Sequence, residues 1–116
     1  MSQHKIYSMT FAKIYHCYVI KIEKKKRTVA ELHQVISWLT GYNDEQLQQQ
    51  LMSGASVREF FQTAPSLNKK RRLIKGTICG LRVEDIEEPL MQELRYLDKL
   101  VDELAKGKDI PSVLRS

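Results

Sequence analysis

The sequence contains few of the residues that interrupt or cross-link a chain: among 116 residues there are 5 Gly, 3 Pro and 2 Cys. This scarcity excludes collagen-like and low-complexity chains, and it excludes a small secreted fold stapled by disulfides. No apolar run approaches the roughly 18 residues of a membrane span, and no apolar block typical of a signal peptide follows the first charges. We therefore expect a cytoplasmic protein that has no part in a membrane and keeps Cys17 and Cys79 reduced.

The remaining composition is that of an ordinary globular protein, with 42% hydrophobic and 28% charged residues. Surface-area scaling for a chain of this length predicts that about two-thirds of the unfolded surface is buried on folding. That fraction supports a core without cross-links. We therefore expect residues 1–116 to form a single domain.

Three helix starts carry a capping box, in which an N-cap side chain and the side chain three residues later each bind the other's backbone N–H. The pairs are Thr28 with Glu31, Asn43 with Gln46, and Ser56 with Glu59. Apolar residues at spacings of three and four follow each box, and Gly41, Gly54 and Pro65 mark the ends of the three predicted helices. In the first of them, Trp38 lies beside the apolar stripe and is expected at the rim of the core.

Apolar stripes predict one further helix on each side of these three. The earlier one spans residues 10–26 and carries Phe11, Ile14, Tyr15, Tyr18, Val19 and Ile22. The later one begins at Pro89 and follows a bundle seam with spacings of four and three, formed by Leu90, Leu94, Leu97, Val101 and Leu104. Gly107 closes this last helix and Pro111 prevents its continuation.

Residues 73–83 fit two secondary structures, because their apolar positions match a helix and also alternate as in a strand. A lone strand has no partner, and no other convincing strand is evident with which it could pair. The segment is therefore predicted to be helical from about Asn68. The fold class follows as an all-α domain of five or six helices, or as α+β if residues 73–83 form a strand.

Several short segments across the chain are similar to a known bacterial family. They are Ile6–Met9, Trp38–Tyr42, Ile78–Gly80, Arg82–Glu84, Glu88–Met91 and Tyr96–Leu104. With them the sequence resembles the bacterial family catalogued as domain of unknown function 2200. The resemblance implies a stand-alone bacterial domain of about this length, and it brings no activity, cofactor or functional residue with it.

Motifs for catalysis or metal binding are absent from the sequence. The candidate metal ligands lack the spacing of a zinc site; they are His4, His16, Cys17, His33 and Cys79. Both cysteines are expected to be buried and inert, since neither has a sequence neighbour that would orient a base. No Gly-rich phosphate loop, nucleophile elbow or dinucleotide fingerprint occurs. We therefore expect no catalytic, cofactor-binding or metal-binding residues, and we favour a protein without enzymatic activity over an enzyme.

Positive charge is concentrated in the first part of the chain, where residues 1–75 hold 13 Lys and Arg against 5 Asp and Glu. Two clusters supply most of the excess, residues 24–27 and the set Lys69, Lys70, Arg71, Arg72 and Lys75. The second set, placed along the start of one helix, would contact nucleic-acid phosphates without selecting a sequence. A nucleic-acid-binding accessory protein is therefore one functional hypothesis.

The other hypothesis, which we prefer, is a non-catalytic module for protein interaction or self-association. Tyr96 lies outside the apolar seam of the last helix, with Arg95, Lys99 and Glu103 around it. An exposed aromatic ringed by both signs of charge is typical of a modest two-fold interface. We therefore expect a weak homodimer through this helix, or an unidentified protein partner.

Overall fold

Within residues 5–78 and 80–115, which the computed structural model of the protein describes, the chain forms six α-helices, three short 3₁₀ helices and one β-hairpin. The α-helices are α1 (Phe11–Glu23), α2 (Val29–Thr40), α3 (Asp44–Ser53), α4 (Val57–Gln62), α5 (Pro89–Ala105) and α6 (Ile110–Val113). The 3₁₀ helices are η1 (Lys5–Ser8), η2 (Lys69–Leu73) and η3 (Val83–Asp85), and the strands are β1 (Thr77–Ile78) and β2 (Leu81–Arg82). The predicted mainly helical fold is confirmed.

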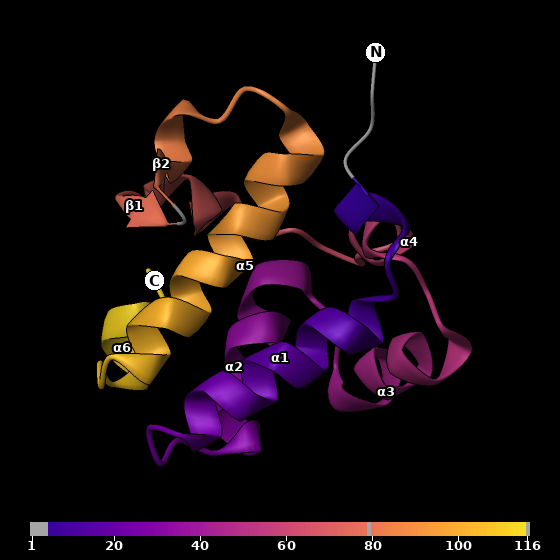
Figure 1. Ribbon diagram of the computed structural model, residues 1–116, viewed down its shortest axis with the longest axis horizontal. Coiled ribbons are helices and arrows are strands. Elements are labelled where there is room, and N and C mark those ends of the chain that lie inside the picture. Colours follow the sequence, from indigo (N-terminus) through magenta and orange to yellow (C-terminus); the bar gives the residue numbers. More distant parts are fainter. Residues whose placement is uncertain (1–4, 79, 116) are drawn as a thin grey trace.

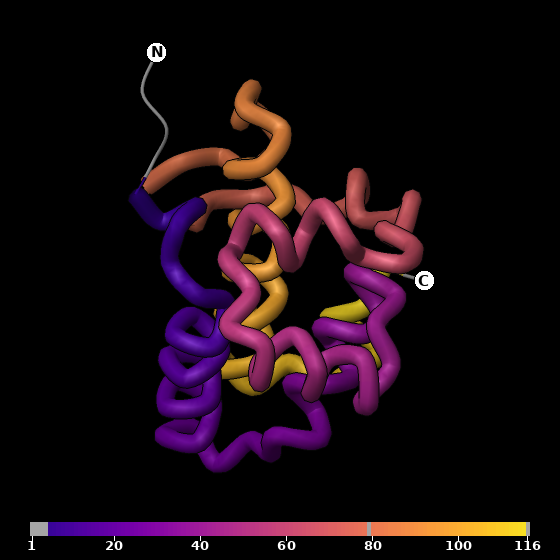
Figure 2. The backbone as a smooth tube through the Cα atoms, turned by 90° about the vertical axis from the view of Figure 1, so that its right-hand side faces the viewer, coloured from indigo at the N-terminus to yellow at the C-terminus, as the bar shows by residue number. Residues whose placement is uncertain are grey.

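Helix α5 is the centre of the fold, in contact with α1, α2, α4 and α6. Figure 1 shows it running diagonally across the molecule, with the hairpin and α6 on one side of it. Figure 2, turned by 90°, shows α1 and α2 on opposite sides of α5. This arrangement buries the seam of α5 almost completely: Leu94, Leu97, Val101 and Leu104 are buried as predicted, while Leu90 is half-buried.

The three predicted capping boxes are confirmed, because both reciprocal hydrogen bonds are present at Thr28, Asn43 and Ser56. Helices α2 and α3 end at Gly41 and Gly54, with φ of 82° and 73°, in the left-handed region that favours glycine. Gly41 has a second reason to be glycine. A Cβ atom there would lie 2.9 Å from the backbone nitrogen of Ser66.

The prediction of a helix from Asn68 through residues 73–83 is wrong. After the short 3₁₀ helix η2, the chain forms a hairpin in which Thr77 pairs with Arg82 and Ile78 with Leu81. Gly76 and Gly80 have φ of 113° and 78°, values that no α-helix accommodates. The alternative of strand structure holds here, since the partner strand lies within the same segment rather than elsewhere in the chain. The tiny hairpin leaves the fold mainly α.

The predicted burial of the two cysteines can be compared with the structure at Cys17. Cys17 is exposed, and its predicted burial is wrong because α1 turns Phe11, Tyr18 and Ile22 toward the core instead. Cys79 lies outside the described residues, so its predicted burial stays a prediction. Among the described helices, none has the length and apolarity that crossing a lipid bilayer requires.

Candidate functional site

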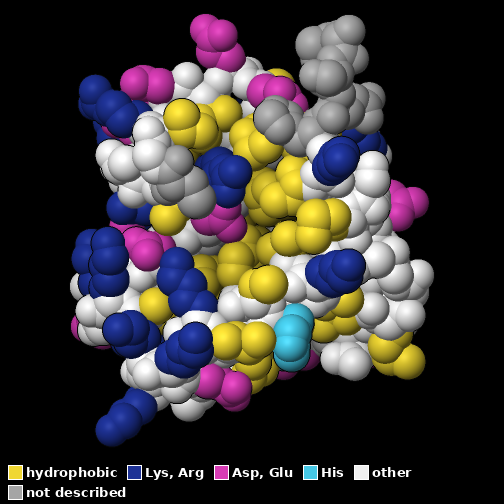
Figure 3. All heavy atoms as spheres, viewed as in Figure 1, with side chains coloured by type: hydrophobic (Ala, Val, Ile, Leu, Met, Phe, Trp, Pro, Cys, Tyr) yellow, Lys and Arg dark blue, Asp and Glu magenta, His cyan; other side chains and the backbone are white. Residues whose placement is uncertain are grey.

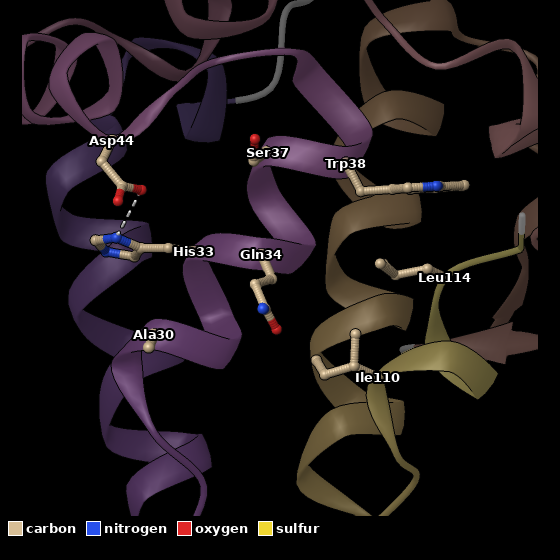
Figure 4. Close-up of a pocket in the computed structure, with 8 residues that line it drawn as sticks. All are labelled: Ala30, His33, Gln34, Ser37, Trp38, Asp44, Ile110 and Leu114. Atoms are coloured by element: carbon tan, nitrogen blue, oxygen red, sulfur yellow. Dashed lines mark ion pairs between the residues drawn. The ribbon is translucent and has the colours of Figure 1, made fainter.

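A groove of about 680 Å³ runs along the outer face of α2, between α6 and the start of α3 (Figure 4). Its lining residues are Ala30, His33, Gln34, Ser37, Trp38, Asp44, Ile110 and Leu114. We call it the α2–α6 groove. Its volume falls within the range of about 300–1,000 Å³ that is usual for ligand sites.

The floor of the groove follows from the amphipathic pattern of α2. This helix buries Leu32, Val35, Ile36 and Leu39 against the rest of the core. The opposite face therefore points outward and carries Ala30, Gln34 and Ser37, which recur at the spacing of one helical turn. These side chains are small or polar, so the helix presents a shallow floor rather than an apolar ridge.

One wall of the groove contains His33 and Asp44, and His33 also contacts Tyr15 behind it. The Nε2 atom of His33 lies 2.5 Å from the hydroxyl oxygen of Tyr15, on α1. The Nδ1 atom of His33 lies 3.5 Å from Oδ1 of Asp44, the first residue of α3 (Figure 4). The Asp44 carboxylate can only accept, so it favours a proton on Nδ1, and in that tautomer Nε2 accepts a hydrogen bond from Tyr15.

These two contacts orient the imidazole, with Nδ1 toward the Asp44 carboxylate and Nε2 toward the Tyr15 hydroxyl. Burial, and after it the negative charge of Asp44, raises the pKa of Tyr15, so its hydroxyl remains protonated at neutral pH. Figure 4 shows the Ser37 hydroxyl pointing away from the imidazole, so it forms no nucleophile–base pair.

The other wall is apolar and consists of Trp38, Ile110 and Leu114. All three are partly buried and pack against the main core, so the predicted place of Trp38 at the rim of the core is confirmed. Figure 4 shows the indole ring extending from α2 toward the side of the groove where Leu114 and Ile110 lie. The wall therefore combines one large aromatic surface with two aliphatic side chains.

Two arginines hold residues 108–115, the segment that contributes Ile110 and Leu114 to this wall. At its start, the Arg27 guanidinium donates a hydrogen bond of 2.8 Å to the backbone oxygen of Lys108, and it also binds Glu31. At its end, Arg115 binds the carboxylate of Glu103, which is only 4% exposed. Helix α6 spans four residues. Its position therefore depends on these anchors more than on its own helical stability.

The five predicted nucleic-acid contacts do not lie along one α-helix, and that part of the prediction is wrong. Arg71 binds Glu93 at 2.8 Å, and Arg72 donates to the side-chain oxygens of Gln92 and Tyr96, at 2.8 and 3.2 Å. These bonds hold η2 against α5. Lys69, Lys70 and Lys75, by contrast, are exposed.

The two basic clusters are well separated in the fold. Figure 1 shows residues 24–27, in the connection between α1 and α2, at the bottom of the molecule and the hairpin after the second cluster near its top. In the view of Figure 3, Lys and Arg side chains gather along the left-hand margin, and hydrophobic side chains form a strip across the centre. Binding of nucleic acid by either cluster stays a prediction.

The predicted self-association surface is largely covered within the monomer. Tyr96 is only 2% exposed, because η2 crosses it and places the Arg72 guanidinium 6.0 Å from the centre of its ring. Glu103 is buried by its pairing with Arg115. Lys99 reaches the backbone oxygen of Thr77 in the hairpin. The expectation that Tyr96 is exposed is therefore wrong, and self-association stays a prediction without this surface. Arg95, the fourth residue of the set, is ion-paired with Asp98 on the same helix.

A second hollow, of about 450 Å³, lies on the outer side of the first turns of α1. Its lining is mostly apolar and includes Met9, Ala12 and the exposed Cys17. In the part of the chain that the structure describes, no three His, Cys, Asp or Glu side chains gather as metal ligands would. The α2–α6 groove is the stronger site, since it joins oriented polar groups to an aromatic wall.

Sequence reasoning missed the residues that build this groove. Tyr15, His33 and Asp44 come from three helices and have no informative spacing, so only their tertiary arrangement connects them. Helix α6 did leave a local signal: Asp109 caps it by accepting a hydrogen bond from the backbone of Ser112. Pro111, interpreted as the residue that stops α5, belongs to the first turn of α6.

Comparisons with known proteins agree with this fold. A crystal structure of uncharacterized protein SP1917 is 47% identical and superposes with a TM-score of 0.91, covering 98% of this chain and 93% of the other. No curated protein matches the chain. Residues 5–115 match the family described as "Uncharacterized protein conserved in bacteria (DUF2200)". The chain therefore belongs to this bacterial family, as the similar segments in its sequence had indicated.

Proposed function

We propose that this protein is a cytoplasmic, non-catalytic binding module that holds a short segment of a partner protein in the α2–α6 groove. The observation that carries the proposal is the half-buried Trp38, which stands with Ile110 and Leu114 across the groove from the oriented His33. Partly exposed tryptophan beside aliphatic side chains is typical of the residues that dominate binding energy at protein interfaces.

The shape of the groove favours a peptide segment over a small metabolite. Sites for small molecules enclose most of the ligand surface and offer several convergent polar groups. Here the floor is one face of α2, the walls stand on two sides only, and the polar groups are spread over the floor and one wall (Figure 4). An extended or helical segment fits a groove of this form, with its apolar side chains against the aromatic wall.

The non-catalytic part of the proposal is supported by the lining of the groove. Figure 4 shows its hydroxyl residue, Ser37, pointing away from the imidazole of His33, so the two do not pair as a nucleophile and its base. His33, held between Tyr15 and Asp44, presents an oriented polar group to a partner. Such preorganised groups lower the entropic cost of binding.

The proposal is tested by selecting displayed random peptides on the immobilised protein and titrating the selected peptides in synthetic form. The chain has 1 Trp, so tryptophan emission reports on the groove alone. We expect the selected peptides to shift this emission and to lose affinity for Ala30→Arg, which places a long side chain over the floor. The matched control is Gln49→Arg, on the exposed face of α3.

Two results would contradict the proposal. In one, selected peptides bind without any change in Trp38 emission. In the other, Ala30→Arg and Gln49→Arg affect binding equally. Circular dichroism spectra and thermal melts of both variants establish that each retains the fold, because both substitutions are at exposed positions.

A further inference from the structure

The end of the α2–α6 groove at Trp38 adjoins the 3₁₀ helix η2. The Asn68 side-chain amide donates a hydrogen bond of 3.2 Å to the backbone oxygen of Trp38. The backbone N–H of Asn68 donates one of 2.9 Å to the backbone oxygen of Leu39. The Asn68 side-chain oxygen in turn accepts from the backbone of Lys70, at 2.8 Å. Lys69 and Lys70 therefore follow directly after the residue that is bonded to the backbone of Trp38.

These two lysines carry unpaired positive charge. Both are exposed, and neither forms an ion pair with a carboxylate anywhere in residues 5–78 and 80–115. Their neighbours Arg71 and Arg72 are different, since they bind α5 and hold η2 in place. The positive charge of Lys69 and Lys70 therefore remains available to a partner, as does that of the exposed Lys75 farther along the chain.

The carboxylates nearest this end of the groove are already neutralised. Glu93 is paired with Arg71 at 2.8 Å, and both side chains are largely buried. Glu103 is paired with Arg115, next to the wall residue Leu114. Among the lining residues of the groove, the acidic one is Asp44, on the other wall, and its side chain is 85% exposed. Lys69 and Lys70 lie outside this lining, beyond the end of the groove at Trp38.

We propose that the partner segment is an acidic, amphipathic peptide, which places apolar side chains against Trp38 and its carboxylates toward Lys69 and Lys70. This inference rests on the proposed function of the groove. Unpaired cations beside an apolar anchor attract an acidic partner during encounter and fix its register once bound. Single-stranded nucleic acid would also meet cations and an aromatic ring, but Ile110 and Leu114 offer aliphatic contacts and no stacking surface for further bases.

The test uses synthetic probes rather than a natural partner. Three peptides share one length and one pattern of Leu residues, and they carry Glu, Lys or Gln at the remaining positions; an oligothymidine is the fourth probe. Each is titrated into the wild-type protein while Trp38 emission is recorded. We expect the Glu peptide to bind most tightly and to shift the emission.

Charge-reversal variants then locate the contact. The double variant Lys69→Glu/Lys70→Glu is expected to lower the affinity for the Glu peptide by about tenfold or more. The control Lys24→Glu/Lys25→Glu makes the same change of charge in the other basic cluster, also at exposed positions. It is expected to reduce the affinity less, since these lysines lie in the connection between α1 and α2, away from the end of the groove at Trp38.

The outcomes separate this inference from the proposed function. If the Lys or Gln peptide binds as tightly as the Glu peptide and shifts Trp38 emission, the acidic preference is overturned while the peptide groove stands. Equal losses in the two double variants overturn the inference as well, because attraction would then be general. Tighter binding of oligothymidine makes nucleic acid the partner and overturns it. If no peptide shifts the emission, the proposed function itself fails.

Discussion

Arg115 binds Glu103 through two parallel hydrogen bonds, of 2.6 and 2.7 Å, between its guanidinium and a carboxylate that is almost completely buried in α5. A planar guanidinium matches a carboxylate in this bidentate form better than any other side chain. The pair joins the end of the described chain to the central helix. It thereby fixes Leu114 and, with it, the apolar wall of the α2–α6 groove.

Replacing Arg115 by Ala should therefore destabilise the protein strongly. The change leaves a buried carboxylate without its main partner, and Lys108, 4.0 Å away, replaces only part of the interaction. We expect a loss of about 3 kcal/mol in the free energy of unfolding, measured by denaturant titration. The double variant Arg115→Ala/Glu103→Gln should recover part of this loss, since it removes the buried charge. An unchanged unfolding midpoint in Arg115→Ala would contradict the anchoring role.

Glu31 gives a prediction about pH. The hydrogen bond from Arg27, followed by the one from the backbone N–H of Thr28, lowers the pKa of Glu31 from 4.5 to about 2. A pKa that is lower in the folded state contributes stability above about pH 4.5, and this contribution is lost as the pH falls toward 2. Carboxyl carbon resonances followed by NMR should show the low midpoint.

In Arg27→Gln, the pKa of Glu31 should rise toward its usual value, because the largest cause of the shift is gone. Lys26→Gln removes the same charge from the exposed neighbouring residue and should leave the titration almost unchanged. A midpoint for Glu31 near 4.5 in the wild-type protein would show that the bidentate contact with Arg27 does not persist in solution.

The tautomer of His33 is a direct consequence of its two contacts. At mildly alkaline pH, the neutral ring should carry its proton on Nδ1, since Asp44 accepts there and Tyr15 donates to Nε2. Long-range proton–nitrogen NMR spectra distinguish the two tautomers. Asp44→Ala should shift the population toward the Nε2–H form, whereas Glu45→Ala, at the adjacent exposed position, should not. A wild-type ring protonated on Nε2 would refute the proposed chain of hydrogen bonds.

Two glycines at helix ends allow backbone strain and steric contact to be separated. Gly41 and Gly54 both have positive φ, but a Cβ atom at Gly41 would approach the Ser66 backbone to 2.9 Å, while the space around Gly54 is open. Gly54→Ala should therefore cost about 1 kcal/mol through strain alone. Gly41→Ala should cost more, about 2 kcal/mol, because the segment after α4 must also move. Equal losses in denaturant titrations would show that the contact is unimportant.

The parts of the fold that could be predicted are those with local causes. The capping boxes at Thr28, Asn43 and Ser56 depend on two residues three positions apart, and the seam of α5 depends on spacings of three and four. Both patterns are complete within one element. The hairpin at Thr77–Arg82 is also local, but the segment was considered as one lone strand without a partner, whereas it holds both paired strands.

The candidate site could not be predicted, because its parts meet only in the tertiary structure. The chain of Tyr15, His33 and Asp44 crosses three helices, and the four residues of α6 are too few to display a periodic pattern. The burial of Tyr96 could not be predicted either, because it depends on another element of the fold. Its charged neighbours on α5 suggested exposure, whereas the residue that covers it, Arg72, belongs to a 3₁₀ helix that has no amphipathic signature.

The most direct test of the account is to map the binding surface of the Glu–Leu peptide by amide chemical shifts in ¹⁵N-labelled protein. The account predicts that the shifted amides cluster along the outer face of α2, from Ala30 to Trp38, and on the neighbouring residues Ile110, Leu114 and Lys69. Shifts confined to other surfaces, such as the hollow beside Cys17, would contradict it, as would an unchanged spectrum at saturating peptide.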